Sequence, residues 1–375
     1  MSGRVRQFWQ QITEGTANDQ LWAQLRSEAR TSYRLYSREV DWVRGEKESR
    51  WQRSKRIARS FFWAMVLKLS PARRVLFVAA LVLLFFPGFD LRYRGAIFEM
   101  PNLAFFGAII LLVLFALELA DRVTMKRDLQ IAKEIQGWMM PTAAPVIPGL
   151  EISFATRPAN TVAGDYYDTF FRPLLNDGET CNNTLLIVVA DVAGKSVPAA
   201  LLMATLRASL RTLAGACTGL PELMLRLNRY ACEQNASGQR FTTVFLAEFD
   251  LTTRQLTYIN AGHNWPVLRR TSGAVERLER GGLPIGVLRT AQYEYGTTKL
   301  SPGDMLLIFT DGLIEAENER EEEFGEQRTF AVLDATAGAS ASYILQNLMS
   351  AADQFVGAAP QHDDITCLVL RETST

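Results

Sequence analysis

The alternation of apolar and polar positions divides the chain into four segments. Residues 1–74 carry apolar residues at helical spacing among many charged ones, which predicts a helical region. Residues 75–120 are dominated by two long apolar stretches, and residues 121–149 return to helical spacing before a Pro-rich linker. In residues 150–375, short apolar runs alternate with amphipathic segments, which predicts a soluble domain of mixed strands and helices.

The two apolar stretches of the second segment are residues 75–89 and 103–120. A membrane-spanning helix needs about 20 apolar residues, so the second stretch qualifies and the first is short. Both are apolar on every face, which lipid accepts and a soluble core seldom requires. We therefore expect a transmembrane hairpin in contact with lipid. Basic residues at both flanks predict a multi-pass membrane protein with both ends in the cytoplasm, although Arg92 and Arg94 reduce the charge contrast.

Charge is distributed unevenly along the chain. Forty basic and 40 acidic residues cancel, so the net charge gives no reason to expect a nucleic-acid partner. Residues 1–74 nevertheless hold 16 basic and 7 acidic residues, which predicts a basic helical cytoplasmic region. Within it, residues 61–69 fit either a helix at the membrane surface or an ordinary solvated helix.

The segment after the apolar stretches is expected to continue as a helix into water. Met125, Leu129, Ala132 and Met139 approximate one apolar seam, and Pro141 ends the pattern. Fewer than three heptads fit equally well a coiled coil that joins two copies through residues 121–140 and a single helix packed on the next domain. Residues 142–149 are the expected linker.

The soluble domain has the pattern of an α+β fold. Residues 241–250 and 255–260 predict a hairpin, because β-branched and aromatic residues alternate around a turn. Further apolar strands are expected at 305–310 and 366–370, and helical periodicity appears at 197–214 and 222–233. An antiparallel sheet with helices grouped outside it follows from this order.

An acidic residue interrupts the apolar pattern where a strand gives way to a helix. The run 185–190 is short and β-rich, so Asp191 is expected at a strand end, followed by a turn and a helix with Ser196 as its cap and Pro198 in its first turn. The intervening GKS is not a phosphate loop, because Val189 occupies the position where that motif needs a glycine. A lone Asp at such a turn often has only a structural role.

Other acidic residues recur at the ends of predicted strands. Asp311 follows an apolar strand as Asp191 does, Asp363 and Asp364 precede another, and Asp165 follows Gly164. Carboxylates that gather at one sheet edge raise one another's pKa unless cations neutralise them, and oxygen ligands alone suit Mg²⁺ or Mn²⁺. Two such ions would activate a water for attack on phosphate. With only two histidines in the chain, a Ser-His-Asp triad or a His-rich metal site is not expected.

Six motifs then resemble one known family. They are AGDYYD, VVADVAGKSVPAALLMA, INAGHN, GGLPIG, FTDGLIEA and HDDIT, spread over about residues 135–370. In this order they resemble the metal-dependent serine/threonine phosphatases of the 2C (PPM) type, in the bacterial branch of the stage II sporulation phosphatase. The resemblance implies a four-layer α-β-β-α sandwich of two antiparallel sheets, two Mn²⁺ or Mg²⁺ ions and a phosphoserine or phosphothreonine protein substrate.

The resemblance also assigns roles to individual residues. Asp191 would bridge both metals and, with Asp311, form the catalytic centre. The other implied ligands are the Val192 carbonyl and the side chains of Asp165 and Asp363, while supporting roles fall to Asp364, Gly164, Gly194 and Gly312. The chain departs from the family pattern at Ala163 and Ser196, where glycines are usual. His263 is expected to have a structural hydrogen-bonding role, whereas His362 would either touch the site or be exposed.

These observations together predict a membrane-anchored, metal-dependent phosphoprotein phosphatase in a bacterial signalling pathway. The resemblance suggests a phosphorylated anti-sigma-factor antagonist as substrate. The alternative is a catalytically inactive membrane scaffold of the same fold that binds a regulator.

Overall fold

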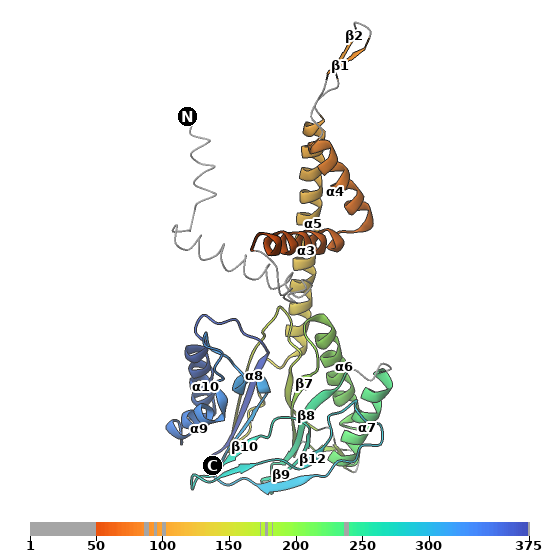
Figure 1. The fold of residues 1–375 in the computed structure, drawn as a ribbon. Coiled ribbons are helices and arrows are strands. Elements are labelled where there is room, and N and C mark those ends of the chain that lie inside the picture. The colour runs from red at the N-terminus through yellow and green to blue at the C-terminus, as the bar shows by residue number, and fades with distance from the viewer. Residues whose placement is uncertain are drawn as a thin grey trace, which may run out of the picture. The chain divides into compact units, whose positions relative to one another are not determined.

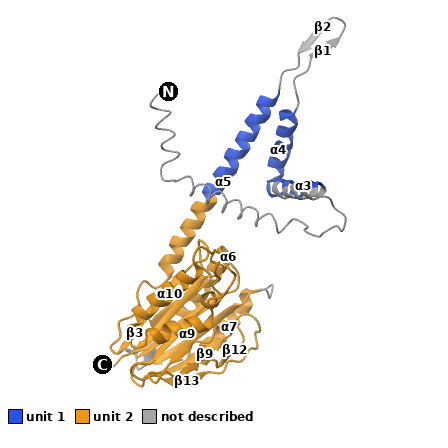
Figure 2. Cartoon of the chain, turned by 60° about the vertical axis from the view of Figure 1, so that its left-hand side comes forward, with its two compact units in different colours: residues 1–124 blue, residues 125–375 orange. Residues whose placement is uncertain are grey.

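The computed structural model describes residues 50–85, 90–93, 96–99, 103–172, 174–176, 179–181, 183–235 and 240–373. The chain separates into two compact units, residues 1–124 and 125–375, which are coloured separately in Figure 2. Most of the predicted basic region, residues 1–49, lies outside the described residues.

The described part of the first unit consists of helices and one small hairpin. Its elements are α3 (Arg50–Lys68), α4 (Pro71–Leu84), β1 (Asp90–Tyr93), β2 (Ala96–Glu99) and the first part of α5 (Ala104–Met139). Strands β1 and β2 pair antiparallel between the two helices that correspond to the predicted apolar stretches.

Helices α4 and α5 form a closely packed antiparallel pair. Gly107 allows the approach, because a Cβ there would lie 2.7 Å from the carbonyl oxygen of Ala80. At the other end of the pair, a guanidinium nitrogen of Arg73 lies 3.3 Å from Glu118 and 2.6 Å from Asp121. Small residues commonly bring helices together in this way where lipid removes the hydrophobic drive for association.

Only one of the described helices is long and apolar enough to cross a membrane. This helix is α5, and just 11% of its most apolar window is buried, unlike a core helix of a soluble protein. Helix α4 has 14 residues, so it is about 21 Å long at 1.5 Å per residue and falls short of the roughly 30 Å hydrocarbon layer. The expected two-span hairpin is therefore not confirmed.

Helix α5 runs without a break from its apolar part to Met139, so the predicted helical continuation beyond residue 120 is present. Ile131, Ile135 and Trp138 remain exposed on it, and Trp138 keeps 80% of its surface. These side chains recur at helical spacing and leave an apolar face that nothing in the described residues covers.

The second unit contains two main sheets. The first sheet contains β3 (Leu150–Arg157), β10 (Val267–Arg269), β11 (Val275–Arg277), β14 (Met305–Phe309) and β15 (Ile365–Glu372). Its strand order is β11-β10-β14-β15-β3. The second contains β4 (Tyr166–Phe171), β7 (Thr184–Val192), β8 (Thr242–Asp250), β9 (Gln255–Ala261), β12 (Gly281–Gly282) and β13 (Gly296–Lys299), in the order β12-β9-β8-β7-β4 with β13 also on β9. A small hairpin, β5 (Leu174–Asn176) with β6 (Glu179–Cys181), stands apart.

Strand β7 shows why the two sheets stack. Its side chains alternate between faces, and almost all are buried on both. Leu186, Val188 and Ala190 pack under α6 (Val197–Leu213) and α7 (Leu220–Gln234), whereas Ile187 and Val189 face the other sheet. A strand apolar on both faces therefore needs a layer on each side, which explains its unbroken apolar run.

The remaining helices close the opposite side. Helices α9 (Gly325–Ala335) and α10 (Ala341–Val356) pack on the outer face of the five-stranded sheet, and the short α8 (Asp311–Ile314) follows β14. Figure 1 shows α9 and α10 on one side of the sheets and α6 and α7 on the other. The α+β prediction is confirmed, and the layers run helix, sheet, sheet, helix. One pair departs from the antiparallel expectation, because β12 pairs parallel with β9.

Candidate active site

The predicted acidic residues come from both sheets. Asp191 lies in β7, one residue before that strand ends, and Asp165 immediately precedes the neighbouring β4. Asp311 follows β14 by two residues, and Asp363 precedes β15, which pairs with β14. Antiparallel neighbours bring the end of one strand beside the start of the next, so all four residues reach the same edge of the sandwich.

Asp165 is the most deeply buried of these carboxylates, with 1% of its surface exposed. The hydroxyl of Thr310 donates a 3.0 Å hydrogen bond to its Oδ2. Burial first, and then the charge of Asp191, raise the pKa of Asp165 well above its usual range. Thr310 precedes Asp311, so this bond ties the two sheets together at the site.

Asp191 lies among the other acidic groups. Burial raises its pKa to about 7, and the charges of Asp311 and Asp363 add to the shift, while hydrogen bonding with Asp165 lowers it. A carboxylate in this position is unstable as an anion unless a positive charge compensates it. The arrangement therefore favours either a proton or a cation at Asp191.

Asp311 and Asp363 face a lysine. Burial and then the charge of Asp363 raise the pKa of Asp311, whereas Lys195 opposes the shift. The Lys195 ammonium lies 3.3 Å from Oδ2 of Asp363. It also donates a 2.6 Å hydrogen bond to the carbonyl oxygen of His362.

Asp364 differs from its neighbour in its contacts. Its two carboxylate oxygens accept hydrogen bonds of 2.7 Å from the amide of Ala159 and 2.6 Å from the amide of Gly164. Because Gly164 immediately precedes Asp165, these bonds hold the Asp165 loop against β15. This geometry fits the orienting role expected for Asp364, which uses both oxygens for backbone amides.

The turn after Asp191 has an unusual backbone. Gly194 adopts φ 121°, a region that favours glycine, and Ser196 adopts φ 67° with ψ −148°. That second conformation is essentially confined to glycine, so Ser196 holds the turn under strain. The prediction that Ser196 caps α6 is wrong for its side chain, which makes no capping hydrogen bond.

Close packing explains two of the other supporting glycines. A Cβ on Gly312 would lie 2.1 Å from the carbonyl oxygen of Asp364, the residue before β15. No larger residue therefore fits at position 312. A Cβ on Gly164 would lie 3.2 Å from the carbonyl oxygen of Val192. The Asp165 loop and the Val192 carbonyl, an expected metal ligand, therefore lie next to each other.

The donor set suits hard divalent cations. It consists of carboxylate and carbonyl oxygens, without histidine or cysteine, and burial disfavours its negative charge. Within the described part of the chain, however, no group of three or more acidic, histidine or cysteine side chains could hold a metal ion as it stands. The raised pKa values of Asp165, Asp191 and Asp311 nevertheless show that these carboxylates lie near enough to act on neighbouring acids.

The two histidines have different surroundings. His263 is buried, its Nδ1 lies 3.1 Å from the Thr243 hydroxyl, and its backbone amide donates to Asn260. Burial lowers its pKa to about 4, so the ring is neutral at pH 7. These contacts fit the structural role expected for His263. His362 is exposed, with Nε2 3.7 Å from Glu317.

Sequence reasoning missed three contacts around the site. They are the pairing of Lys195 with Asp363, an ion pair between the half-exposed Arg211 and the buried Asp168, and the pairing of Gln136 with Ala163. In the last, the Gln136 amide donates to the Ala163 carbonyl oxygen at 2.7 Å and accepts from the Ala163 amide at 3.0 Å. Asp168 carried a signal in the sequence as the second acid of AGDYYD, and Lys195 as the lysine of GKS, whereas Gln136 and Arg211 carried none.

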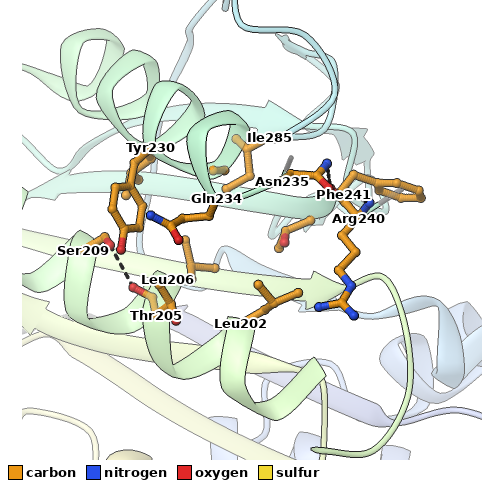
Figure 3. Close-up of a pocket in the computed structure, with 13 residues that line it drawn as sticks. Leu202, Thr205, Leu206, Ser209, Tyr230, Gln234, Asn235, Arg240, Phe241 and Ile285 are labelled. Atoms are coloured by element: carbon orange, nitrogen blue, oxygen red, sulfur yellow. Dashed lines mark hydrogen bonds between the residues drawn. The ribbon is translucent and has the colours of Figure 1, made fainter. Parts of the chain in front are cut away.

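Two of the cavities lie close to the predicted ligands or to α6. One, of about 240 Å³, lies beside the carboxylates and is lined by Lys195, Asp363, Gln361 and several glutamates. The other, of about 110 Å³, lies between α6 and α7, where Figure 3 shows Leu202 and Leu206 on one helix facing Tyr230 and Gln234 on the other. None of the predicted ligands lines this second cavity, so the first is the one relevant to the chemistry.

Comparison with known proteins decides the family. The model of the stage II sporulation protein E (SpoIIE) family matches residues 182–373, just over half of the chain. The chain belongs to the SpoIIE family. Among related proteins, RsbU of Bacillus subtilis, a phosphoserine phosphatase, is 29% identical over 249 residues, covering 66% of this chain and 70% of RsbU. Protein IcfG of Synechocystis sp. is 29% identical over 284 residues, covering 68% of this chain but 43% of IcfG.

The SpoIIE-family chain also shares its fold with solved phosphatase domains. The SiaA-PP2C domain of Pseudomonas aeruginosa superposes with a TM-score of 0.58 at 23% identity, covering 67% of this chain and 98% of that domain. The resemblance seen in the motifs is thus confirmed at the level of family and fold.

Proposed function

We propose that this SpoIIE-family chain is a metal-dependent phosphatase that hydrolyses phosphoserine or phosphothreonine in a protein. The observation that carries the proposal is the environment of Asp191, a half-buried carboxylate whose pKa the neighbouring acids help to raise to about 7. A scaffold would gain nothing from keeping such mutually repelling groups, whereas a two-metal site requires them.

Each residue has a defined task in this proposal. Two Mn²⁺ or Mg²⁺ ions would be held by Asp191, Asp311, Asp165, Asp363 and the Val192 carbonyl. When bound, the ions supply charge neutralisation and an activated water. Asp364 keeps the Asp165 loop in place through the two amides that it binds. Thr310 orients the Asp165 carboxylate from the other sheet.

The test is hydrolysis of a phosphoserine peptide by the full-length chain in detergent. Activity should require Mn²⁺ or Mg²⁺, disappear with a chelator and return when the metal is restored. A folded chain that binds neither ion by calorimetry would favour the alternative of an inactive scaffold.

For the substrate, we propose a phosphorylated anti-sigma-factor antagonist. RsbU is named a phosphoserine phosphatase, and a structure of the RsbU and RsbW domains of a Mycobacterium tuberculosis protein matches this chain over 63% of that structure's length, at 24% identity and a TM-score of 0.51. In cells carrying Asp311→Asn, the substrate should accumulate its phosphoserine relative to wild type. A phosphoproteome without such a change would contradict the assignment.

We also propose that the chain is anchored in the cytoplasmic membrane and pairs with a second copy. The exposed apolar surface of α4 and α5 supports the anchor, and the uncovered face of α5 at Ile131, Ile135 and Trp138 supports the pairing. The protein should remain in carbonate-washed membranes, and Ile135→Cys should form an intermolecular disulfide there. Cross-linking no stronger than for a cysteine at Lys133, an exposed position on the opposite face of α5, would argue against this seam.

Helix α5 reaches the site through Gln136. Because Gln136 binds both backbone groups of Ala163, two residues before Asp165, a shift of α5 would move a metal ligand. Gln136→Leu should weaken Mn²⁺ affinity about tenfold, as loss of groups that support a ligand commonly does. Calorimetry measures this, and Gln130→Leu on the same helix, where the amide is exposed, is the control. Equal Mn²⁺ affinities in both variants would show that α5 does not influence the site through Gln136.

A further inference from the structure

Lys195 places a positive charge at the edge of the carboxylate site. Its ammonium lies 3.3 Å from Oδ2 of Asp363 and 2.6 Å from the carbonyl oxygen of His362. The side chain remains 57% exposed, so part of the ammonium faces solvent. An ammonium has three donors, and the two contacts leave one of them for another acceptor.

The cavity beside the site would otherwise repel an anion. Its lining, as far as the described residues show, includes four acidic side chains, and Lys195 is its one lysine or arginine; the acids are Glu315, Glu317, Glu323 and Asp363. A phosphate ester entering here carries negative charge and needs a compensating donor. Lys195 is placed to supply it.

A structural role alone explains Lys195 poorly. A solvent-exposed lysine–carboxylate pair adds little to stability, and ordering a lysine side chain costs entropy of comparable size. The turn that carries Lys195 is in addition strained at Ser196. If Asp363 held a divalent cation, its charge would be directed to that ion, and the ammonium of Lys195 would become available to another anion.

We propose that Lys195 binds the phosphoryl group of the substrate, donating from Nζ to a non-bridging oxygen. The inference rests on the proposed phosphatase function. In that reaction the P–O bond to the serine oxygen breaks, a P–O bond to the attacking water forms, and a proton from water goes to the serine oxygen. Lys195 neither gives nor takes this proton. It positions the phosphoryl group and offsets its charge.

Inorganic phosphate is the probe that tests this role. In the full-length Mn²⁺-loaded protein, Lys195→Met should raise the KM for a phosphoserine peptide and the Ki of orthophosphate by about 10- to 100-fold, the value of one charge-assisted hydrogen bond. Lys195→Arg should restore both constants to within about threefold, because it keeps the charge. Lys299→Met, an exposed lysine on β13, should change neither constant.

Two measurements separate this inference from its alternatives. Mn²⁺ affinity by calorimetry should stay unchanged in Lys195→Met; a loss of Mn²⁺ affinity with an unchanged Ki would show a purely structural lysine and overturn the proposal. Orthophosphate binding by calorimetry does not depend on turnover. If wild type binds orthophosphate through Lys195 but hydrolyses nothing, the proposed function fails while this site stands.

Discussion

Asp191→Ala should abolish the metal-dependent hydrolysis of a phosphoserine peptide. Loss of groups that only support a metal ligand costs about 10–100-fold, so loss of the ligand expected to bridge both ions should cost more, about 10³-fold or beyond. The measurement is kcat with Mn²⁺ in saturating amounts. Glu279→Ala, which removes an exposed carboxylate outside the site, should retain wild-type activity.

Asp191 should also make the stability of the metal-free protein depend on pH. Asp191 has a pKa of about 7 in the folded state against 3.8 ordinarily, so between these values the folded state holds a proton that the unfolded state has lost. Without metal, stability attributable to this group therefore falls as pH rises from about 4 to about 7. Asp191→Asn should reduce that fall in urea unfolding with a chelator present. An unchanged pH dependence, together with full activity of Asp191→Ala, would refute the assigned site.

The apolar pattern predicted the secondary structure well where strands and helices are strongly periodic. The expected hairpin at 241–250 and 255–260 appears as β8 and β9, and the helix at 197–214 appears as α6. Element ends differ by a few residues, as with α7, which begins at Leu220 where Pro221 can occupy the first turn. Asp191 was expected to end its strand, but β7 continues to Val192 because Val192 still pairs with Thr242.

Contacts between residues far apart in the chain could not be predicted from the sequence. Gln136 and Ala163 are hydrogen-bonded only because α5 and the Asp165 loop come together in the folded domain. Neither residue type, read in the sequence, predicts such a contact. The first apolar stretch shows the same limit. Its composition favoured a spanning helix, yet α4 starts at Pro71 and ends at Leu84, and packing at Gly107 sets its position on α5.

The site was predictable in part because acids are costly inside a protein. Acids that recur at the ends of several predicted strands need an explanation that a single turn does not, and the fold gathers them at one edge of the sandwich. The strain at Ser196 was not predictable in the same way. The sequence showed a serine where relatives carry glycine, but only the backbone shows that the position keeps a glycine-type conformation.

Arg211→Met should give the largest loss of stability. Asp168 is fully buried, and its carboxylate accepts hydrogen bonds from Arg211 at 2.7–2.9 Å and from the Tyr166 hydroxyl at 2.9 Å. Removing the guanidinium leaves a buried charge without its partner, which costs about 3–5 kcal/mol when both groups are buried. Because Arg211 is 40% exposed, we expect the lower end, about 3 kcal/mol, in the free energy of unfolding by urea.

Two variants give this prediction its controls. Arg226→Met breaks an exposed pair with Glu222 on α7 and should cost less than about 1 kcal/mol. Adding Asp168→Asn to Arg211→Met removes the buried charge itself and should recover much of the loss, because an unpaired amide is cheaper to bury than an unpaired carboxylate. Equal destabilisation by Arg211→Met and Arg226→Met would show that solvent already screens the pair. If instead the double variant recovers stability, the unpaired charge of Asp168 accounts for the loss in Arg211→Met, and the ion pair between α6 and β4 is needed to neutralise that charge.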